Sequence, residues 1–278
     1  MIAAFARMAR VAVGEVGAVG AVGVNGHDAA PYLHAAQRAA SCVHDRLWRA
    51  ESQTLLRRFR DGQAEIDGYA DDYAYLIFGL LELFQADGDP AWIEWAVQLQ
   101  DRQDALFWDE VDGGWFSTTG QDRTVLLRMK EDYDGAEPSA SSISVMNLLV
   151  LSHLIDNPRW TEQIERTLRA FGSRLEQVGR AVPMMGAALS TSLAGVQQCV
   201  FVGAETERRQ LARVMAGRYL PFAVTIDVRA EHRDRLASIM PIVGGMLPPA
   251  DGAAAYVCRH FACQAPVTSV RELEGILA

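Results

Sequence analysis

The chain has 278 residues, half of them hydrophobic, so it is long enough to bury one large core or two smaller ones. Its formal net charge of −9 argues against a nucleic-acid partner, because such proteins gather positive charge on one face. No apolar run approaches the roughly 18 residues that would span a membrane. Four cysteines in this length do not indicate a disulfide framework. We therefore expect a cytoplasmic protein.

The N-terminal part predicts two helices and an extended piece. Residues 1–18 are rich in Ala, Gly and Val, but charged residues interrupt them, which favours a helix over a signal peptide. The Gly-rich residues 19–26 predict a loop. Residues 28–48 predict an amphipathic helix, because apolar residues recur on one face. Residues 55–62 predict a short strand or extended piece that ends in a turn.

The middle of the chain alternates two kinds of predicted helix. Residues 74–84 are apolar on every face, which is typical of a helix enclosed on all sides, whereas residues 91–105 are apolar on one side only. The pairing recurs in residues 141–155 and 160–175, as a weak internal repeat of helical hairpins. Residues 182–193 predict a third inner helix.

Enclosed helices that alternate with one-sided helices, joined by short turns, predict a mainly α fold. We expect a partial (α/α)6 toroid of helical hairpins whose inner helices line a central cavity. A plain helical bundle is the alternative, although it does not require alternate helices to be enclosed. Residues 107–118 place Asp-Gly-Gly between aromatic residues, which predicts a hairpin turn on the rim.

The character of the sequence changes after residue 195. The elements predicted there are strands at 196–202, 223–228 and 254–267 and helices at 205–218 and 269–277. Ser269, with Glu272 three positions later, predicts a capping box at the start of the last helix. We therefore predict two domains: a helical-hairpin part-toroid over residues 1–195, and a small C-terminal α/β unit over residues 196–278 that packs on it.

Two acidic helix starts are the strongest candidate for a site. One precedes the first enclosed helix, and the other, residues 130–139, precedes the second; Pro138 suits its first turn. If both helices run in the same direction, these starts meet at one rim. Cleavage of a glycosidic bond needs two carboxylates, one protonated and one ionised, and aromatic rings suit a sugar. The predicted catalytic residues are Asp72, Glu137, Asp71 and Asp134, and the predicted ligand-binding residues are Tyr73, Tyr133, Glu131 and Trp115.

Two other readings of the acidic starts stay open. The carboxylates can cap helices and complement the helix dipole, each worth about 0.3–1 kcal/mol, in a non-catalytic scaffold or interaction domain. A sugar epimerase would instead need histidine bases. His153 lies roughly 24 Å beyond Glu137 along a helix that rises about 1.5 Å per residue, so it is predicted to be structural.

Cys258 and Cys263 invite a metal or redox interpretation. They differ by five positions, so on one strand they point to opposite faces. Without a turn between them, neither a disulfide nor a chelate forms. The chain also has no Gly-rich phosphate loop and no Cys-x-x-Cys, so we expect no metal and no cofactor.

Several stretches carry a family resemblance. They are residues 67–74 (DGYADDYA), 99–103 (LQDRQ), 107–116 (FWDEVDGGWF), 130–139 (KEDYDGAEPS) and 256–268 (YVCRHFACQAPVT). They resemble the C-terminal part of the thioredoxin-fused, spermatogenesis-associated proteins, which include the bacterial YyaL-like proteins. The resemblance implies a thioredoxin-like domain followed by an (α/α)6 toroid of the six-hairpin glycosidase type, akin to N-acylglucosamine 2-epimerases. A carbohydrate-related function is implied only by analogy of fold.

The chain departs from that family pattern in one large respect, because it has no thioredoxin-like domain. Fewer helices precede the α/β tail than a closed toroid contains, so we expect a fragment of a longer protein. A part-toroid exposes inner-helix surface, which predicts a partner: a second copy of the chain or the missing N-terminal half. A redox accessory function is implied only by the absent domain.

Overall fold

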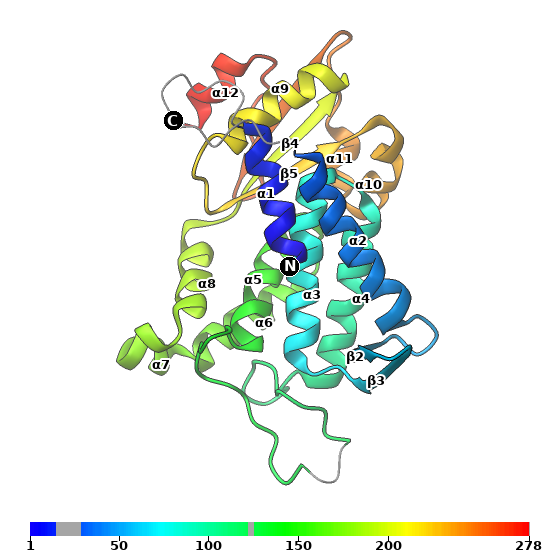
Figure 1. Ribbon diagram of the computed structural model, residues 1–278. Coiled ribbons are helices and arrows are strands. Elements are labelled where there is room, and N and C mark those ends of the chain that lie inside the picture. The colour runs from blue at the N-terminus through cyan, green and yellow to red at the C-terminus, as the bar shows by residue number, and fades with distance from the viewer. Residues whose placement is uncertain (15–28, 122–124, 278) are drawn as a thin grey trace. The chain divides into compact units, whose positions relative to one another are not determined.

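The computed structural model describes residues 1–14, 29–121 and 125–277, and most of them are helical (Figure 1). The chain divides into two compact units, each built from segments far apart in the sequence. The helical unit comprises residues 39–81 and 94–194. The sheet unit comprises residues 1–38, 82–93 and 195–278. Helices α2, α3 and α4 are continuous and contribute to both units.

Helical hairpins form the helical unit, as the alternation of apolar patterns predicted. Its helices are α3 (Ala70–Asp87), α4 (Pro90–Phe107), α5 (Ala140–Leu154), α6 (Pro158–Ala170), α7 (Gly172–Val178), η1 (Gly179–Ala181) and α8 (Pro183–Ala194). Helix α5 is buried on nearly all sides. Helix α6 buries only one stripe, formed by Trp160, Gln163, Ile164 and Thr167 at helical spacing. The predicted pairing of an enclosed helix with a one-sided helix is thus confirmed here.

The one-sided stripe predicted to run from residue 160 to residue 175 is interrupted. Helix α6 ends at Ala170, and Phe171 leaves helical geometry, with φ −90° and ψ 1°. Helix α7 then starts at Gly172 and buries none of its residues. The apolar spacing continues past Phe171 although the helix itself ends there, and the spacing alone does not reveal that end.

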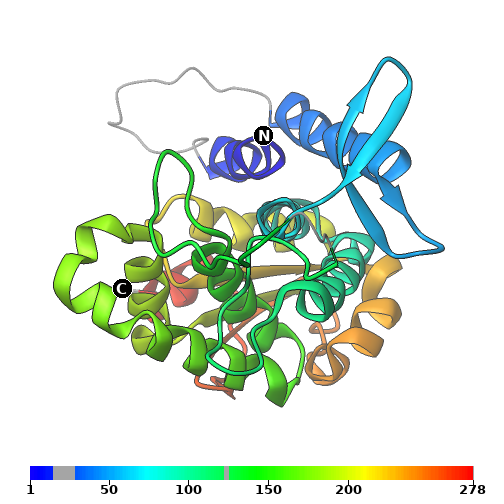
Figure 2. The same cartoon turned by 90° about the horizontal axis from the view of Figure 1, so that it is seen from below.

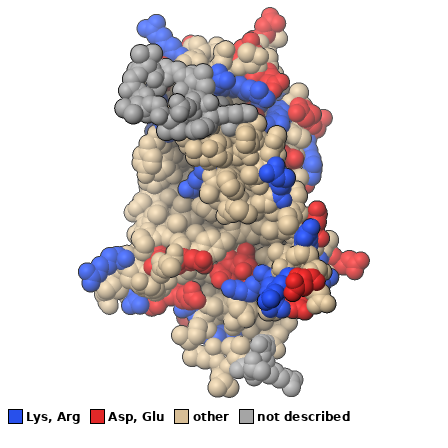
Figure 3. All heavy atoms as spheres, viewed as in Figure 1, with Lys and Arg blue, Asp and Glu red and all other residues tan. Residues whose placement is uncertain are grey.

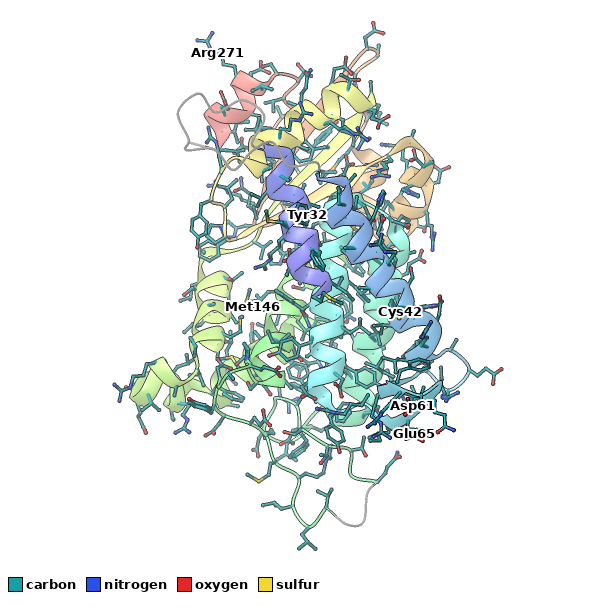
Figure 4. The ribbon with its side chains drawn as sticks, viewed as in Figure 1. Tyr32, Cys42, Asp61, Glu65, Met146 and Arg271 are labelled. Carbon is teal, nitrogen blue, oxygen red and sulfur yellow. A yellow bond between two sulfur atoms is a disulfide. The ribbon has the colours of Figure 1, made fainter. Side chains whose placement is uncertain are left out.

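A small hairpin precedes α3 in the helical unit. Strands β1 (Trp48–Arg49), β2 (Thr54–Arg60) and β3 (Gln63–Asp67) form an antiparallel sheet in that order. The β2–β3 ribbon extends outward in Figure 2, and Figure 4 shows Asp61 at its turn and Glu65 on β3. The predicted strand is confirmed, but its partner β3 was not predicted, because residues 63–67 carry a charged pattern with little apolar content.

A mixed four-stranded sheet forms the core of the sheet unit. Its strands are β4 (Gln197–Gly203), β5 (Ala223–Val228), β6 (Ala253–Arg259) and β7 (Ala262–Cys263), in the order β5-β4-β6-β7. The central strand β4 runs parallel to β5 and antiparallel to β6. Its residues are buried up to Val202, which explains the apolar run from Cys199 to Val202.

Several helices belong to the sheet unit. They are α1 (Ile2–Gly14), α9 (Glu205–Ala216), η2 (Ala230–His232), α10 (Arg233–Ile239), α11 (Pro241–Gly245) and α12 (Val270–Ile276), together with the first part of α2 (Ala30–Leu47). Leu211 of α9 and Leu273 of α12 join the buried cluster around Phe201 of β4. The predicted capping box of Ser269 and Glu272 is present at the start of α12.

The charges in the N-terminal helix have a structural role. Glu82 is buried and accepts a hydrogen bond from Arg7 at 2.8 Å, and it also pairs with Arg10. The predicted helix over residues 1–18 is confirmed as far as Gly14. Its last residues and the loop predicted at 19–26 lie outside the described residues.

The structure corrects the prediction for the two C-terminal cysteines, because Cys258 and Cys263 form a disulfide. His260 and Phe261 adopt positive φ angles of 49° and 62°, and this turn folds β7 back onto β6. Cys258 and Cys263 thus become directly opposed partners in an antiparallel ladder, where side chains share a face. The prediction assumed that no turn lies between the two cysteines. The turn at His260 and Phe261 is what allows them to pair.

The fold class predicted from the sequence is confirmed. The chain is mainly α, with helical hairpins and, in its C-terminal part, a small α/β arrangement of strands and helices. The division into domains at residue 195 stays a prediction. None of the helices in the described part of the chain combines the length and the apolar character that spanning a bilayer requires.

Candidate functional site

Helix α3 begins with the first acidic pair. Asp71 and Asp72 lie in its first turn, and the Asp72 carboxylate accepts a hydrogen bond of 2.8 Å from the Tyr69 amide. Arg57 of β2 pairs with both acids, at 2.8 Å from Asp72 and 3.3 Å from Asp71. Its guanidinium also lies 4.5 Å from the centre of the Tyr69 ring. The β2–β3 hairpin therefore positions one cation over this helix start.

Asp72 has a perturbed acidity. Burial raises its pKa above the ordinary value of 3.8, the Tyr69 amide opposes this, and neighbouring Asp71 adds to the rise. Its side chain still exposes a quarter of its surface, 25%. Arg57 opposes the rise as well, because its charge favours the ionised carboxylate. A raised pKa combined with contact with solvent is the combination that a general acid uses.

The second acidic stretch leads into α5 through a true N-cap. The Ser139 hydroxyl accepts a hydrogen bond from the Ser142 amide, and the helix begins at Ala140. Pro138 therefore precedes the cap, and its predicted place in the first turn is wrong. A serine hydroxyl can satisfy a free amide of the first turn, which a proline ring cannot, so the cap falls on Ser139.

Asp134 is buried at the centre of this stretch. Its carboxylate accepts hydrogen bonds from the amides of Ser139 at 2.9 Å, Met184 at 2.8 Å and Met185 at 3.3 Å. The same side chain thus joins the start of α5 to the start of α8. This arrangement gives Asp134 a positioning role that the sequence did not predict.

Tyr75 is the group around which the two acidic starts converge. Its hydroxyl donates a hydrogen bond of 2.8 Å to the Pro138 carbonyl. Burial raises the pKa of the Tyr75 phenol to about 12, and the negative charges of four nearby carboxylates contribute to the rise. In order of size, these belong to Glu137, Asp71, Asp134 and Glu131. Acids from both helix starts therefore act on one phenol.

The predicted ligand-binding residues and Glu137 differ in exposure. Glu131, Tyr133 and Glu137 are exposed to solvent. Tyr73 and Trp115 are buried: the Tyr73 hydroxyl accepts from the Leu55 amide, and the Trp115 indole donates to Asp104 at 2.9 Å. Contact of either buried ring with a ligand would require the surrounding side chains to move.

Lys130 contacts an acid outside the predicted set. Its ammonium group lies 2.6 Å from Asp109 and 3.0 Å from the Gly113 carbonyl. Burial alone would raise the pKa of Asp109, but Lys130 and two backbone amides hold it below its usual range. The Asp-Gly-Gly turn was correctly predicted: Gly113 and Gly114 have φ angles of 80° and 79°, and Trp108 pairs with Trp115 across it.

The other titratable groups singled out in the sequence are accounted for. The His153 ring nitrogen lies 2.8 Å from the Leu149 carbonyl one turn earlier, as expected of a structural residue. In the part of the chain that the structure describes, no three His, Cys, Asp or Glu side chains are grouped to hold a metal ion. On the face drawn in Figure 3, acidic and basic side chains are interspersed rather than separated by sign.

Sequence reasoning missed Tyr75 and Arg57. Tyr75 follows Asp71 and Asp72 by four and three positions, so all three lie on one face of α3. That spacing is a signal the sequence contains. Arg57 lies on a different element, and only the fold of the hairpin brings it to α3.

Comparison with known proteins gives one consistent set of relatives. The chain is 37% identical over 213 residues to spermatogenesis-associated protein 20 of Homo sapiens and 36% identical to that of Rattus norvegicus. Each alignment covers 76% of this chain and 27% of the relative. An uncharacterized protein of Caenorhabditis elegans is 33% identical over 218 residues, covering 77% of this chain and 29% of its own. No protein-family model matches the chain.

A solved structure gives a weaker match. Cellobiose 2-epimerase from Spirochaeta thermophila aligns with 61% of this chain and 42% of its own, with a TM-score of 0.41 and 16% identity. A likeness of this degree carries no argument for function. The chain thus spans little more than a quarter of the curated relatives that it matches. Over three quarters of its own length it is similar to spermatogenesis-associated protein 20, which confirms the resemblance predicted from its motifs.

Proposed function

We propose that the chain binds a carbohydrate at the two acidic helix starts and acts on its glycosidic or anomeric bond. One observation carries the proposal: Tyr75, on the helix that Asp71 and Asp72 open, donates a hydrogen bond of 2.8 Å to the Pro138 carbonyl and so joins the two acidic helix starts. A pair of carboxylates in unlike environments is the arrangement that acid/base chemistry on sugars uses.

Asp72 and Glu137 are the proposed acid/base pair. Asp72 is partly buried and has a raised pKa, so it serves as the acid, while the exposed Glu137 serves as the carboxylate base. Asp71 and Asp134 support them, the first beside Arg57 and the second as the buried acceptor. Tyr133 and Glu131 are exposed and available to a ligand, and Tyr73 and Trp115 back the site from within.

The variants Asp72→Asn and Glu137→Gln test this function, with Asp156→Asn as the matched control on an exposed acid outside the site. We expect the two site variants to abolish turnover or binding across a glycan panel while circular dichroism stays unchanged. The control should behave as the parent does. Full activity in both site variants would contradict the assignment, and unfolding of both would show that these residues are structural.

A second candidate is a non-catalytic scaffold or interaction domain. The observation that favours it is that these carboxylates are already used within the fold: Asp72 accepts from the Tyr69 amide at the start of α3, and Asp134 joins α5 to α8. Exposed Leu126 and Leu127, at 99% and 71%, offer apolar surface for a second copy of the chain or for the remainder of a longer protein. A thermal-shift screen against sugars separates the candidates, because a scaffold shows no shift with any of them.

A further inference from the structure

A hollow of about 680 Å³ opens beside the acidic stretch. It is lined by residues of three segments: the Asp-Gly-Gly turn, residues 129–132 and the junction of α6 with α7. Its volume falls within the range of roughly 300–1,000 Å³ that small-molecule sites occupy. The stretch that borders Tyr75 on the candidate site therefore also forms one wall of an open cavity.

The apolar part of the lining is compact. Ala170, at the end of α6, and Met129 contribute exposed carbon surface. Phe171 also borders the hollow, but only 5% of its surface is exposed, so it offers little of its ring to a ligand. A sugar ring has apolar faces, and an aromatic or aliphatic surface of this kind accommodates them.

The charged part of the lining is balanced. Lys130 is paired with Asp109, and Arg174 lies 3.2 Å from the Asp132 carboxylate and 3.1 Å from the Asp132 carbonyl. Asp112, Ser173 and Gln177 add further polar groups. Because each cation among the described residues of the lining already has an acidic partner, these residues present no uncompensated positive charge to attract a carboxylate or phosphate.

The polar groups suit hydroxyl groups. The Arg174–Asp132 pair is largely exposed, at 41% and 61%, and such pairs are held weakly. The Arg174 guanidinium can donate to one hydroxyl of a sugar ring while the Asp132 carboxylate accepts from the neighbouring hydroxyl. Gln177 offers both a donor and an acceptor on the next turn of α7.

We propose that this hollow is a binding subsite for a neutral sugar, with a preference over uronic acids and sugar phosphates. Asp132, Arg174 and Gln177 bind its hydroxyls, and Ala170 and Met129 contact its apolar face. This rests on the carbohydrate function proposed above and adds to it the ligand class and a place next to the acidic helix starts.

Calorimetric titration of the full chain tests the subsite, with cellobiose, maltose and lactose as neutral probes and glucuronic acid and glucose 6-phosphate as charged probes. Ser173→Trp places an indole in the hollow, and Glu176→Trp on the same helix is the matched control, because Glu176 is not part of the lining. We expect Ser173→Trp to weaken binding of a neutral disaccharide roughly tenfold or more. Glu176→Trp should bind as the parent does, and Gln177→Ala should weaken binding without filling the hollow.

The outcomes separate the subsite from the catalytic proposal. Binding of a neutral sugar that Ser173→Trp removes and Glu176→Trp preserves supports the subsite, even if no turnover is found. Turnover or binding that persists unchanged in Ser173→Trp overturns the subsite and leaves the acid/base pair standing. Tighter binding of the charged probes, or no binding of any neutral probe at millimolar concentration, also overturns it.

Discussion

The hydroxyl of Tyr75 donates a hydrogen bond of 2.8 Å to the carbonyl of Pro138. Tyr75 belongs to α3, and Pro138 immediately precedes the cap of α5, so this bond joins the two acidic helix starts. Both residues lie within the helical unit. This hydrogen bond can be tested by mutation without knowing which ligand the candidate site binds.

Tyr75→Phe removes this bond while keeping the ring. We expect a loss of about 1 kcal/mol in the free energy of unfolding, the usual net worth of one hydrogen bond. Urea denaturation measures it. Tyr32→Phe is the control, since that residue lies in the sheet unit (Figure 4). Equal stability of Tyr75→Phe and the parent would show that the bond contributes nothing.

Glu137→Gln should lower the pKa of Tyr75. Burial is the largest cause of its rise to about 12, and the charge of Glu137 is the next. Removing that charge makes the phenolate easier to form, so the titration midpoint moves down. The carbon resonance of the Tyr75 ring, assigned with Tyr75→Phe, reports the change. An unmoved midpoint would mean that Glu137 does not lie near the phenol.

Asp134→Ala should destabilise the chain more than Asp134→Asn. Alanine leaves the amides of Ser139, Met184 and Met185 without their acceptor, whereas asparagine keeps one acceptor oxygen. A buried donor without a partner costs about 1–3 kcal/mol, so we expect a loss of roughly 3 kcal/mol or more for alanine. Chemical denaturation of both variants checks the order. A reversed order would contradict the bonding described for this carboxylate.

Asp104→Asn should change how stability depends on pH. Burial raises the pKa of Asp104 above 3.8, outweighing its hydrogen bonds from Trp115 and Gln100. The folded state thus holds this proton more tightly than the unfolded state, and the contribution of Asp104 to stability falls as pH rises from about 3.8 through the raised value. Both bonds reach the same oxygen, which asparagine can keep.

The stability difference between Asp104→Asn and the parent should therefore shift in favour of the variant as pH rises, and then level off. Thermal melts between acidic and neutral pH measure it. A difference that does not vary with pH would show that Asp104 is not perturbed.

The disulfide predicts a definite count of reactive thiols. Without reductant, Cys42 is exposed and should react, whereas Cys199 is buried, and burial raises its pKa to about 12, which suppresses the reactive thiolate. Denaturation should release Cys199 as a second thiol, and reduction should bring the total to four. Free reaction of Cys258 and Cys263 in the unreduced chain would contradict the bridge.

Reduction of the bridge should also lower stability. The bond between Cys258 and Cys263 closes a short loop, and the chain-entropy relation gives about 2 kcal/mol for a loop of this size. Thermal melts with and without reductant measure the change. Cys258→Ser combined with Cys263→Ser serves as the control, since it should no longer respond to reductant.

Local patterns in the sequence determined the elements and the family resemblance. The helical hairpins were predicted from where apolar residues lie, because burial dictates that placement. Apolar residues lie on every face of the helices at 74–84 and 141–155, and on one face of the helices that follow them. The capping box at Ser269 was likewise a matter of neighbouring residues. These features depend on contacts within a few positions, which the sequence displays directly.

Only the tertiary structure decided which of the acidic residues meet and what holds them. Asp134 proved to be a buried acceptor for α5 and α8, Arg57 reached α3 from another element, and Tyr75 became the point where two helix starts converge. The Cys258–Cys263 bridge likewise depended on a turn with positive φ at two non-glycine residues. Each of these depends on the path of the backbone between distant or strained positions, and no local periodicity encodes that path.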